Sequence, residues 1–313
     1  MNGQRQFLWI MVVMGLVVLA GCGGQAAPAQ VSESVEPSSD PLVVTVSIIP
    51  QSYFVDQIGG DYVKANVMVG AGASPHSYEP TPEQMRALSE SVAYFRIGVE
   101  FENAWMDKIA SANEAMRIVN TTAGIERLPL AAHSHGEEEE HAEEGHAEHE
   151  EGLDPHVWTS PELVKIQSQI IYETLAELDP DHQQAYKTNL DTFIAAIDAL
   201  EAELHGTLQD VSGQKFIVFH PAWGYFAHDF GLEQIPVEVG GQEPSAQELA
   251  ALITEAKEED VHVVFAQPEF STRAAETIAD EIDGEVLLIS PLAYDWLENM
   301  RSVAATFASA LGQ

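Results

Sequence analysis

The chain has 313 residues, 45% of them apolar, which is enough for two domains with hydrophobic cores and excludes a disordered protein as a whole. Fifty acidic residues against thirteen lysines and arginines give a formal charge of -37, so the surface repels nucleic acid and attracts cations. Nucleic-acid binding is therefore excluded. The acidic excess is spread along the chain, and solubility or a saline medium explains it as well as a specific function does.

The first residues have the pattern of an export signal. Arg5 precedes an apolar run of about 14 residues, which suits the core of a signal peptide better than a membrane span. The run ends in Leu-Ala-Gly-Cys, which resembles the lipobox of prokaryotic lipoproteins. Cys22 is the only cysteine and makes no internal disulfide, so lipidation explains its position better than chance does. We expect residues 1–21 to be removed and Cys22 to carry a lipid anchor.

The folded part begins near Pro41, after a flexible tether. Residues 22–40 are rich in Gly, Ala, Pro, Ser and Gln and lack apolar periodicity. Beyond them, short apolar runs alternate with helical patterns, which predicts βαβ units around a mostly parallel sheet. The predicted strands are residues 42–48, 63–69 and 92–97. We assign residues 41–158 to an N-terminal lobe.

One segment of this lobe has no residue that would pack in a core. Residues 133–151 contain five histidines and nine glutamates, which indicates a disordered loop. Imidazole and carboxylate groups at this density bind borderline divalent metals weakly, although a solvated acidic loop is the alternative. We expect weak metal sites at its histidines, which are His133, His135, His141, His146 and His149.

The second half of the chain predicts linking helices and a second lobe. Within residues 159–209, Asp179-Pro180 marks the start of a predicted helix. Apolar residues recur along it at helical spacing up to about His205. A helix of this length would be a rigid rod of roughly 40 Å, long enough to reach both lobes and to limit their closure. Residues 210–313 form the C-terminal metal-binding lobe. Its predicted strands are residues 215–219, 235–239, 261–266 and 285–289, and its predicted helices are residues 245–259 and 271–282. The predicted fold is thus α/β, with two lobes that each hold a mostly parallel sheet flanked by helices, joined by a long rigid helix.

Three histidines occupy loops where a ligand site would be built. His76 comes after the strand that ends at Val69, and His220 directly follows the strand 215–219; open parallel sheets bind ligands at the carboxyl ends of their strands. His156 lies just past the acidic loop. Each of them alone is more often a surface or hydrogen-bonded residue than a ligand. Four others fall in predicted helices or a strand and receive no ligand role: His182, His205, His228 and His262.

Motifs around these histidines occur in a fixed order along the chain. They are Ser74-Pro75-His76-Ser77-Tyr78-Glu79-Pro80 and the segments 98–105, 154–158, 219–226 and 270–281. Over about residues 42–311 the chain is similar to the metal-receptor solute-binding proteins of ABC transporters, in their zinc-uptake branch. The resemblance implies extracytoplasmic capture of Zn²⁺ and its delivery to an ABC-type permease. It also implies that each lobe supplies two ligands, with His76 and His156 from the N-terminal lobe and His220 from the C-terminal lobe.

The fourth ligand departs from the family pattern. The family usually has an aspartate in an Asp-Pro-Leu turn after the last strand, where this chain has Ser290. A serine hydroxyl is a poor zinc ligand, so we expect water at this position or Asp295, for which capping of the next helix is the competing explanation. Imidazole at His220, where the manganese branch carries a carboxylate, favours zinc.

Other functions remain as alternatives. A manganese or iron receptor of the same family is the first. A zinc-dependent hydrolase also uses three histidines and an open position, but the chain has no His-Glu-x-x-His pair and no Gly-x-Ser-x-Gly elbow, so we expect no enzyme. An adhesin is the third, with nothing in the sequence in its favour. The expected partners are Zn²⁺, an ABC permease and the membrane, which the protein contacts through its lipid anchor. We expect a monomer that is located at the cell surface or in the periplasm.

Overall fold

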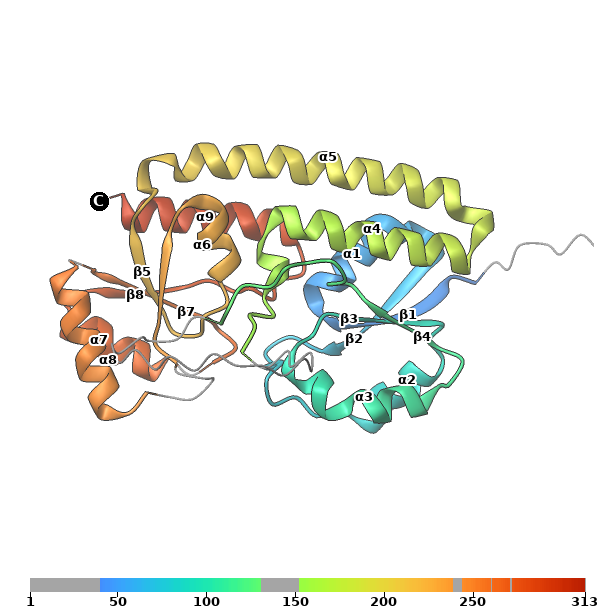
Figure 1. Cartoon of the computed structure of the whole chain (residues 1–313), viewed down its shortest axis with the longest axis horizontal. Coiled ribbons are helices and arrows are strands. Elements are labelled where there is room, and N and C mark those ends of the chain that lie inside the picture. The colour runs from blue at the N-terminus through green and yellow to red at the C-terminus, as the bar shows by residue number, and fades with distance from the viewer. Residues whose placement is uncertain (1–39, 131–151, 239–243, 260, 271, 313) are drawn as a thin grey trace, which may run out of the picture. The chain divides into compact units, whose positions relative to one another are not determined.

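The computed structural model describes residues 40–130, 152–238, 244–259, 261–270 and 272–312. The first sheet has the strand order β2-β1-β3-β4, and all of its pairings are parallel. Its strands are β1 (Leu42–Ile48), β2 (Val63–Val69), β3 (Ala93–Arg96) and β4 (Arg117–Asn120), and its helices are α1 (Ile49–Gly59), α2 (Pro82–Ser89) and α3 (Glu100–Ala112). Figure 1 shows α1 on one face of this sheet and α2 with α3 on the other.

The second sheet repeats this topology with the order β6-β5-β7-β8, again with parallel pairings. Its strands are β5 (Lys215–Val218), β6 (Glu233–Pro236), β7 (Val263–Ala266) and β8 (Glu285–Leu288), and its helices are α6 (Gly224–Phe230), α7 (Ala246–Glu258) and α8 (Arg273–Glu281). The predicted α/β class with two parallel sheets is therefore confirmed.

One strand and several strand boundaries differ from those expected from the sequence. β4 was not among the predicted strands, because this short strand lies at the edge of its sheet and exposes Arg117 and Ile118. The strand expected at residues 235–239 begins at Glu233 and ends at Pro236, and the strand expected at residues 261–266 begins at Val263.

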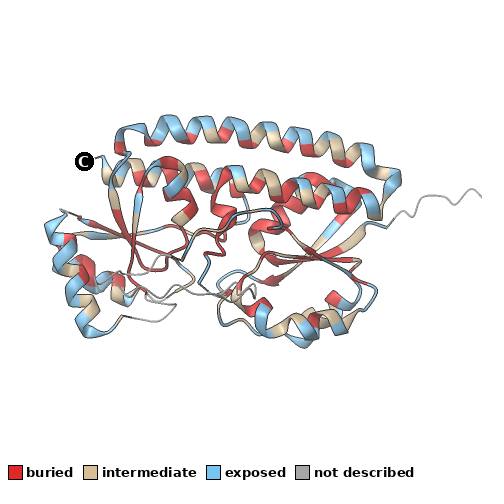
Figure 2. Cartoon of the chain, viewed as in Figure 1, coloured by how far each residue is buried: buried red, intermediate tan, exposed pale blue. Residues whose placement is uncertain are grey.

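Long helices cover both sheets on one side. They are α4 (Pro161–Leu178), α5 (Gln183–Leu208) and α9 (Trp296–Leu311). The 26 residues of α5 begin after a 3₁₀ turn, Pro180–His182, and would extend about 39 Å at the rise of an α-helix. Figure 2 shows that its buried residues face the other helices, and it packs against α1 and α4 as well as α9. One helix thus contacts elements that cover both sheets, as the predicted rod requires.

Two tryptophans join segments from the two halves of the chain. Trp158 Nε1 donates to the carbonyl of Pro291 at 2.7 Å, and Trp296 Nε1 donates to the carbonyl of Trp158 at 2.8 Å. Both indoles are buried, at about 1% exposure. These bonds hold the segment that contains His156 against the segment that follows β8.

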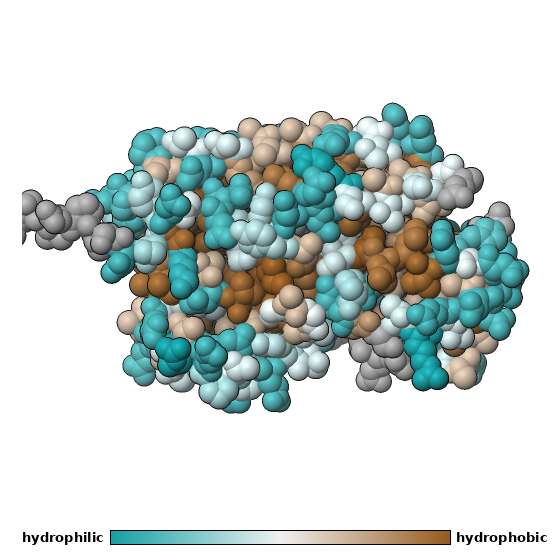
Figure 3. Space-filling view, turned by 180° about the vertical axis from the view of Figure 1, so that it is seen from behind, coloured by the Kyte–Doolittle hydropathy of each residue, from teal (hydrophilic) through white to brown (hydrophobic). Residues whose placement is uncertain are grey.

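The surface matches the acidic composition. Seen from behind in Figure 3, hydrophilic residues cover most of the molecule, and hydrophobic residues gather in a band across its middle. No helix in the described ranges combines the length and the apolar composition that crossing a membrane requires.

Candidate metal centre

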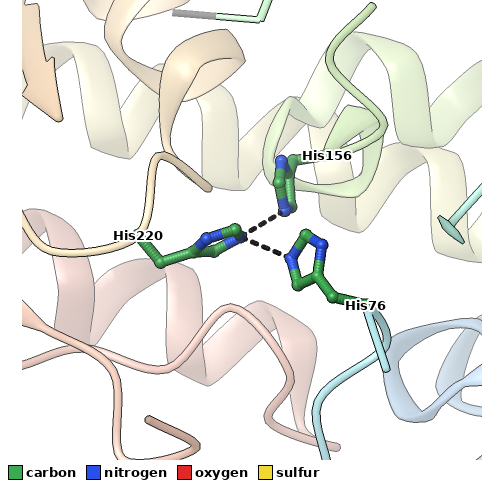
Figure 4. Close-up of side chains that lie close together, drawn as sticks. All are labelled: His76, His156 and His220. Atoms are coloured by element: carbon green, nitrogen blue, oxygen red, sulfur yellow. Dashed lines mark hydrogen bonds between the residues drawn. The ribbon is translucent and has the colours of Figure 1, made fainter. Parts of the chain in front are cut away.

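His76, His156 and His220 meet at one point although they come from three separate loops. His76 follows β2, His156 precedes the 3₁₀ turn Val157–Thr159, and His220 follows β5. His220 Nε2 lies 2.9 Å from His76 Nε2 and 3.1 Å from His156 Nε2, as Figure 4 shows. One ring nitrogen from each histidine lies within 4.8 Å of the other two. The structure therefore brings together the three histidines that the sequence singled out.

Each imidazole is held from behind by a carboxylate. The pairs, each measured from Nδ1 to the nearest oxygen, are His76 with Glu100 at 3.0 Å, His156 with Asp154 at 2.7 Å and His220 with Glu238 at 2.6 Å. The hydrogen bond at one ring nitrogen decides which nitrogen carries the proton. The hydrogen bonds to Asp154 and Glu238 favour the neutral tautomer with the proton on Nδ1 in His156 and His220, which leaves Nε2 of these two rings as the nitrogen that can bind a metal.

The position of one of these carboxylates follows from the local sequence, and the positions of the other two follow from the arrangement of the strands. Asp154 is two residues before His156 and also accepts from the backbone N–H of His156 at 2.8 Å. Glu100 is the first residue of α3, beyond β3, and Glu238 follows β6. β6 pairs with β5, which brings Glu238 beside His220. Sequence reasoning missed Glu100 and Glu238 because only the pairing of strands places them near the histidines.

The surroundings give two of the imidazoles different proton affinities. Burial lowers the pKa of His220 to about 4, and the hydrogen bond that His220 donates to Glu238 offsets only part of this effect. Burial also opposes protonation of His76, but the hydrogen bond and the charge of Glu100 outweigh it and raise the pKa of His76. His76 in turn lowers the pKa of Glu100 to about 2, against the effect of burial. His220 is therefore neutral at physiological pH, whereas His76 binds a proton more readily than a free imidazole.

The spacing of the nitrogens suits a small metal ion. Zn–N bonds of 2.0 to 2.1 Å in a tetrahedral site separate the ligand nitrogens by about 3.3 Å. The observed separations of 2.9 and 3.1 Å require only a slight opening of the cluster. The free space among the rings is about 10 Å³, which is close to that of a single water-sized sphere. The site thus has room for one ion and not for an organic ligand.

Apolar side chains line the cavity. Phe270 stacks on the ring of His220, with centroids 4.8 Å apart and an interplanar angle of 30°. Trp158 packs against His156, with centroids 5.1 Å apart. His156 and His220 are only 4% and 3% exposed. Apolar walls of this kind lower the local dielectric and strengthen the electrostatic interaction between a bound cation and the carboxylates.

The remaining predicted site residues are not in this cluster. Asp295 is exposed, and its Oδ1 accepts from the backbone N–H of Glu298 at 3.3 Å, so it caps α9. Ser290 Oγ instead donates to Glu269 Oε1 at 2.5 Å. The loop histidines at 133, 135, 141, 146 and 149, and Cys22, lie outside the described residues.

The four histidines without a predicted ligand role have other contacts. His182 Nδ1 lies 2.6 Å from Asp179 Oδ2, and its ring stacks on Tyr62. The other three pack or bond separately: His205 against Phe230, His228 beside Asp229, and His262 at the carbonyl of Ile282. His262 also lines a larger cavity of about 720 Å³ at the amino ends of β5 and β7. Within the described ranges, none of them joins a group of possible metal ligands.

Comparisons with known proteins identify the family of this chain. The model of a family described as zinc-uptake complex component A, periplasmic, matches residues 44–310. The high-affinity zinc uptake system protein ZnuA of Bacillus subtilis (strain 168) is 31% identical over 290 residues, which are 88% of this chain and 85% of that protein. A crystal structure of ZnuA is 45% identical, with a TM-score of 0.78, and the match covers 87% of this chain and 99% of that one.

A crystal structure of a zinc-bound ZnuA deletion mutant matches equally well, with 45% identity, a TM-score of 0.78 and coverage of 87% of this chain and 98% of that one. These matches extend over both sheets and the helices between them. They confirm the family that the histidine motifs indicated. The chain therefore belongs to the family of the periplasmic zinc-uptake complex component A.

Proposed function

We propose that His76, His156 and His220 bind the Zn²⁺ ion that this protein captures outside the cytoplasm and delivers to an ABC-type permease. The observation that carries the proposal is the convergence of three Nε2 atoms whose Nδ1 atoms are engaged by carboxylates. Three Nε2 atoms that converge in this way can bind one cation together. Neutral imidazole held in this way is a preferred ligand for zinc.

The dimensions of the cavity favour transport over hydrolysis. A hydrolytic zinc site needs room for a substrate beside the ion. The free space here is about 10 Å³, and the indole of Trp158 and the ring of Phe270 line it. We infer that the protein is a receptor and not an enzyme.

The same proposal includes how the protein is organised and where it acts. We infer that residues 1–21 are a signal peptide, that Cys22 carries a lipid and that residues 22–40 are a tether. The proposed lobes are residues 41–158 and 210–313, with linking helices at 159–209, and the protein acts as a monomer. Mass spectrometry of the native protein tests the anchor: a lipid-modified Cys22 at the N-terminus is expected, and an intact, unmodified segment 1–22 contradicts it.

Zinc titration of single variants tests the site. We expect one tight site in the natural protein, with Zn²⁺ preferred over Mn²⁺ in competition. His220→Ala removes a ligand and should weaken this site at least about tenfold, since even groups that only support a ligand contribute that much. His228→Ala is the matched control, because His228 is exposed on α6. An equal affinity of the two variants would show that the cluster does not hold the ion.

A further inference from the structure

One more carboxylate faces the cavity of the three histidines, and no sequence motif identified it. Glu269 follows β7 and lines the same cavity as His76, His156 and His220. β7 pairs with β5, the strand that leads to His220. Glu269 therefore reaches the site for the same reason as His220 does, namely that the carboxyl ends of neighbouring parallel strands meet at one edge of the sheet.

The two oxygens of Glu269 have unequal surroundings. Oε1 accepts a hydrogen bond of 2.5 Å from Ser290 Oγ. Oε2 is shielded from solvent, and within the described residues it has no hydrogen-bond donor. A buried carboxylate oxygen without a donor or a cation is unfavourable, so such an atom in a native protein calls for a physical explanation. A metal ion in the cavity would provide one.

The backbone of this loop is fixed relative to His220. Gln267 Nε2 donates to the carbonyl of His220 at 2.7 Å, and the backbone N–H of His220 donates to Gln267 Oε1 at 3.2 Å. Gln267 is fully buried. This pair of bonds ties the chain two residues before Glu269 to the histidine loop, so the glutamate starts from a defined position beside the site.

We propose that Glu269 is the fourth zinc ligand, binding through Oε2, and that Ser290 positions it through Oε1. The inference rests on the proposed zinc site and adds the oxygen donor that the family pattern would have placed at position 290. A structural or receptor zinc site is commonly four-coordinate, and a ligating carboxylate is commonly hydrogen-bonded through its other oxygen. The serine at position 290 thus acts on the metal through Glu269 and not by its own hydroxyl.

A modest movement is needed to complete the site. Within the described residues, the possible ligand atoms that lie within 4.8 Å of one another are those of the three histidines, so the carboxylate of Glu269 has to turn inward to reach a bound ion. The side chain has three rotatable bonds beyond its backbone, and Phe270, its neighbour, already stacks on His220. The resulting set of ligands is three neutral imidazoles and one carboxylate.

Glu269→Gln tests the proposal, because the amide keeps the shape and the acceptor for Ser290 but removes the charge. We expect its zinc dissociation constant to rise at least about tenfold. Glu276→Gln, an exposed carboxylate on α8, removes the same charge away from the site and should leave the constant unchanged. Cobalt bound in place of zinc gives a second measurement, because its visible absorption reports the ligands: the spectrum should change in Glu269→Gln only.

A double variant distinguishes a loss of zinc affinity caused by the missing ligand from one caused by altered folding. Adding Ser290→Asp to Glu269→Gln places a carboxylate where the family pattern has it and should recover most of the lost affinity. If Glu269→Gln binds zinc as tightly as the natural protein and its cobalt spectrum is unchanged, the fourth ligand is not Glu269, while the three-histidine site stands. If His220→Ala also binds normally, the proposed function itself fails.

Discussion

Glu238 Oε2 lies 2.6 Å from His220 Nδ1, and the two side chains are only 8% and 4% exposed. They come from neighbouring strands, since His220 follows β5 and Glu238 follows β6. The carboxylate keeps the proton of His220 on Nδ1 and directs the Nε2 lone pair into the cavity. The ionic state of Glu238 therefore contributes to how strongly His220 binds a metal.

Glu238→Gln should weaken zinc binding by about 10- to 100-fold without unfolding the protein. A neutral amide makes the imidazole less basic than a carboxylate does. Its NH₂ group can also donate to Nδ1, which would favour the tautomer with the proton on Nε2, the nitrogen that binds the metal. Zinc titration measures the effect. Glu233→Gln is the control, since Glu233 is an exposed carboxylate on the same strand, β6. Equal affinities of the two variants would mean that the contact with His220 has no part in binding.

The pH dependence of zinc binding should follow His76 more than His220. The pKa of His220 is lowered to about 4, so this ring is already deprotonated when zinc binds near neutrality. The pKa of His76 is raised by Glu100, against the effect of burial, so protons compete with zinc at His76 as pH falls through that raised value. Calorimetry in buffers of different ionisation enthalpy should find that proton release grows as pH falls from 7.5 to 6.

Glu100→Gln should move this dependence to lower pH. Loss of the carboxylate removes the interaction that raises the pKa of His76, so protons displace zinc only at a lower pH. The quantity to measure is the pH at the midpoint of the decline in zinc affinity. This midpoint does not change when a variant loses affinity equally at every pH. A midpoint that stays in place would contradict the role given to Glu100.

Deletion of residues 133–151 should remove weak zinc binding and leave one tight site. The chain on the two sides of this segment is already joined, because Leu130 N–H donates to the carbonyl of Gly152 at 2.9 Å and Pro129 forms a bridge with Leu153. A short link can therefore replace the segment without moving His156. Zinc stoichiometry by titration distinguishes the outcomes, and loss of the tight site would argue against the three-histidine cluster.

Asp295→Ala should lower stability and leave zinc affinity within about twofold. Asp295 caps α9, and loss of such a cap costs about 1 kcal/mol. Asp295→Ser, which retains a capping oxygen, should recover most of the stability. Thermal unfolding without metal measures the first effect and zinc titration the second, and a large loss of affinity would restore Asp295 as a ligand.

The local sequence contains enough information for most of the secondary structure. Apolar runs such as residues 42–48 and 63–69 are long enough to identify buried strands, and Pro and Gly mark their ends. The edge strand β4 was missed because half of its residues are exposed. The sequence also placed His76 in the loop after one predicted strand and His220 directly after another, and parallel sheets present the carboxyl ends of their strands to ligands.

The sequence by itself therefore determined the family, the α/β class and the three histidines, because each depends on short motifs and on local periodicity. Only the tertiary structure decided which carboxylates support the histidines and which one faces the open position. Glu100, Glu238 and Glu269 follow β3, β6 and β7, far along the chain from the rings that they approach. Their place depends on the order of strands in each sheet, and that order is set by packing of the whole chain and not by any local pattern of residues.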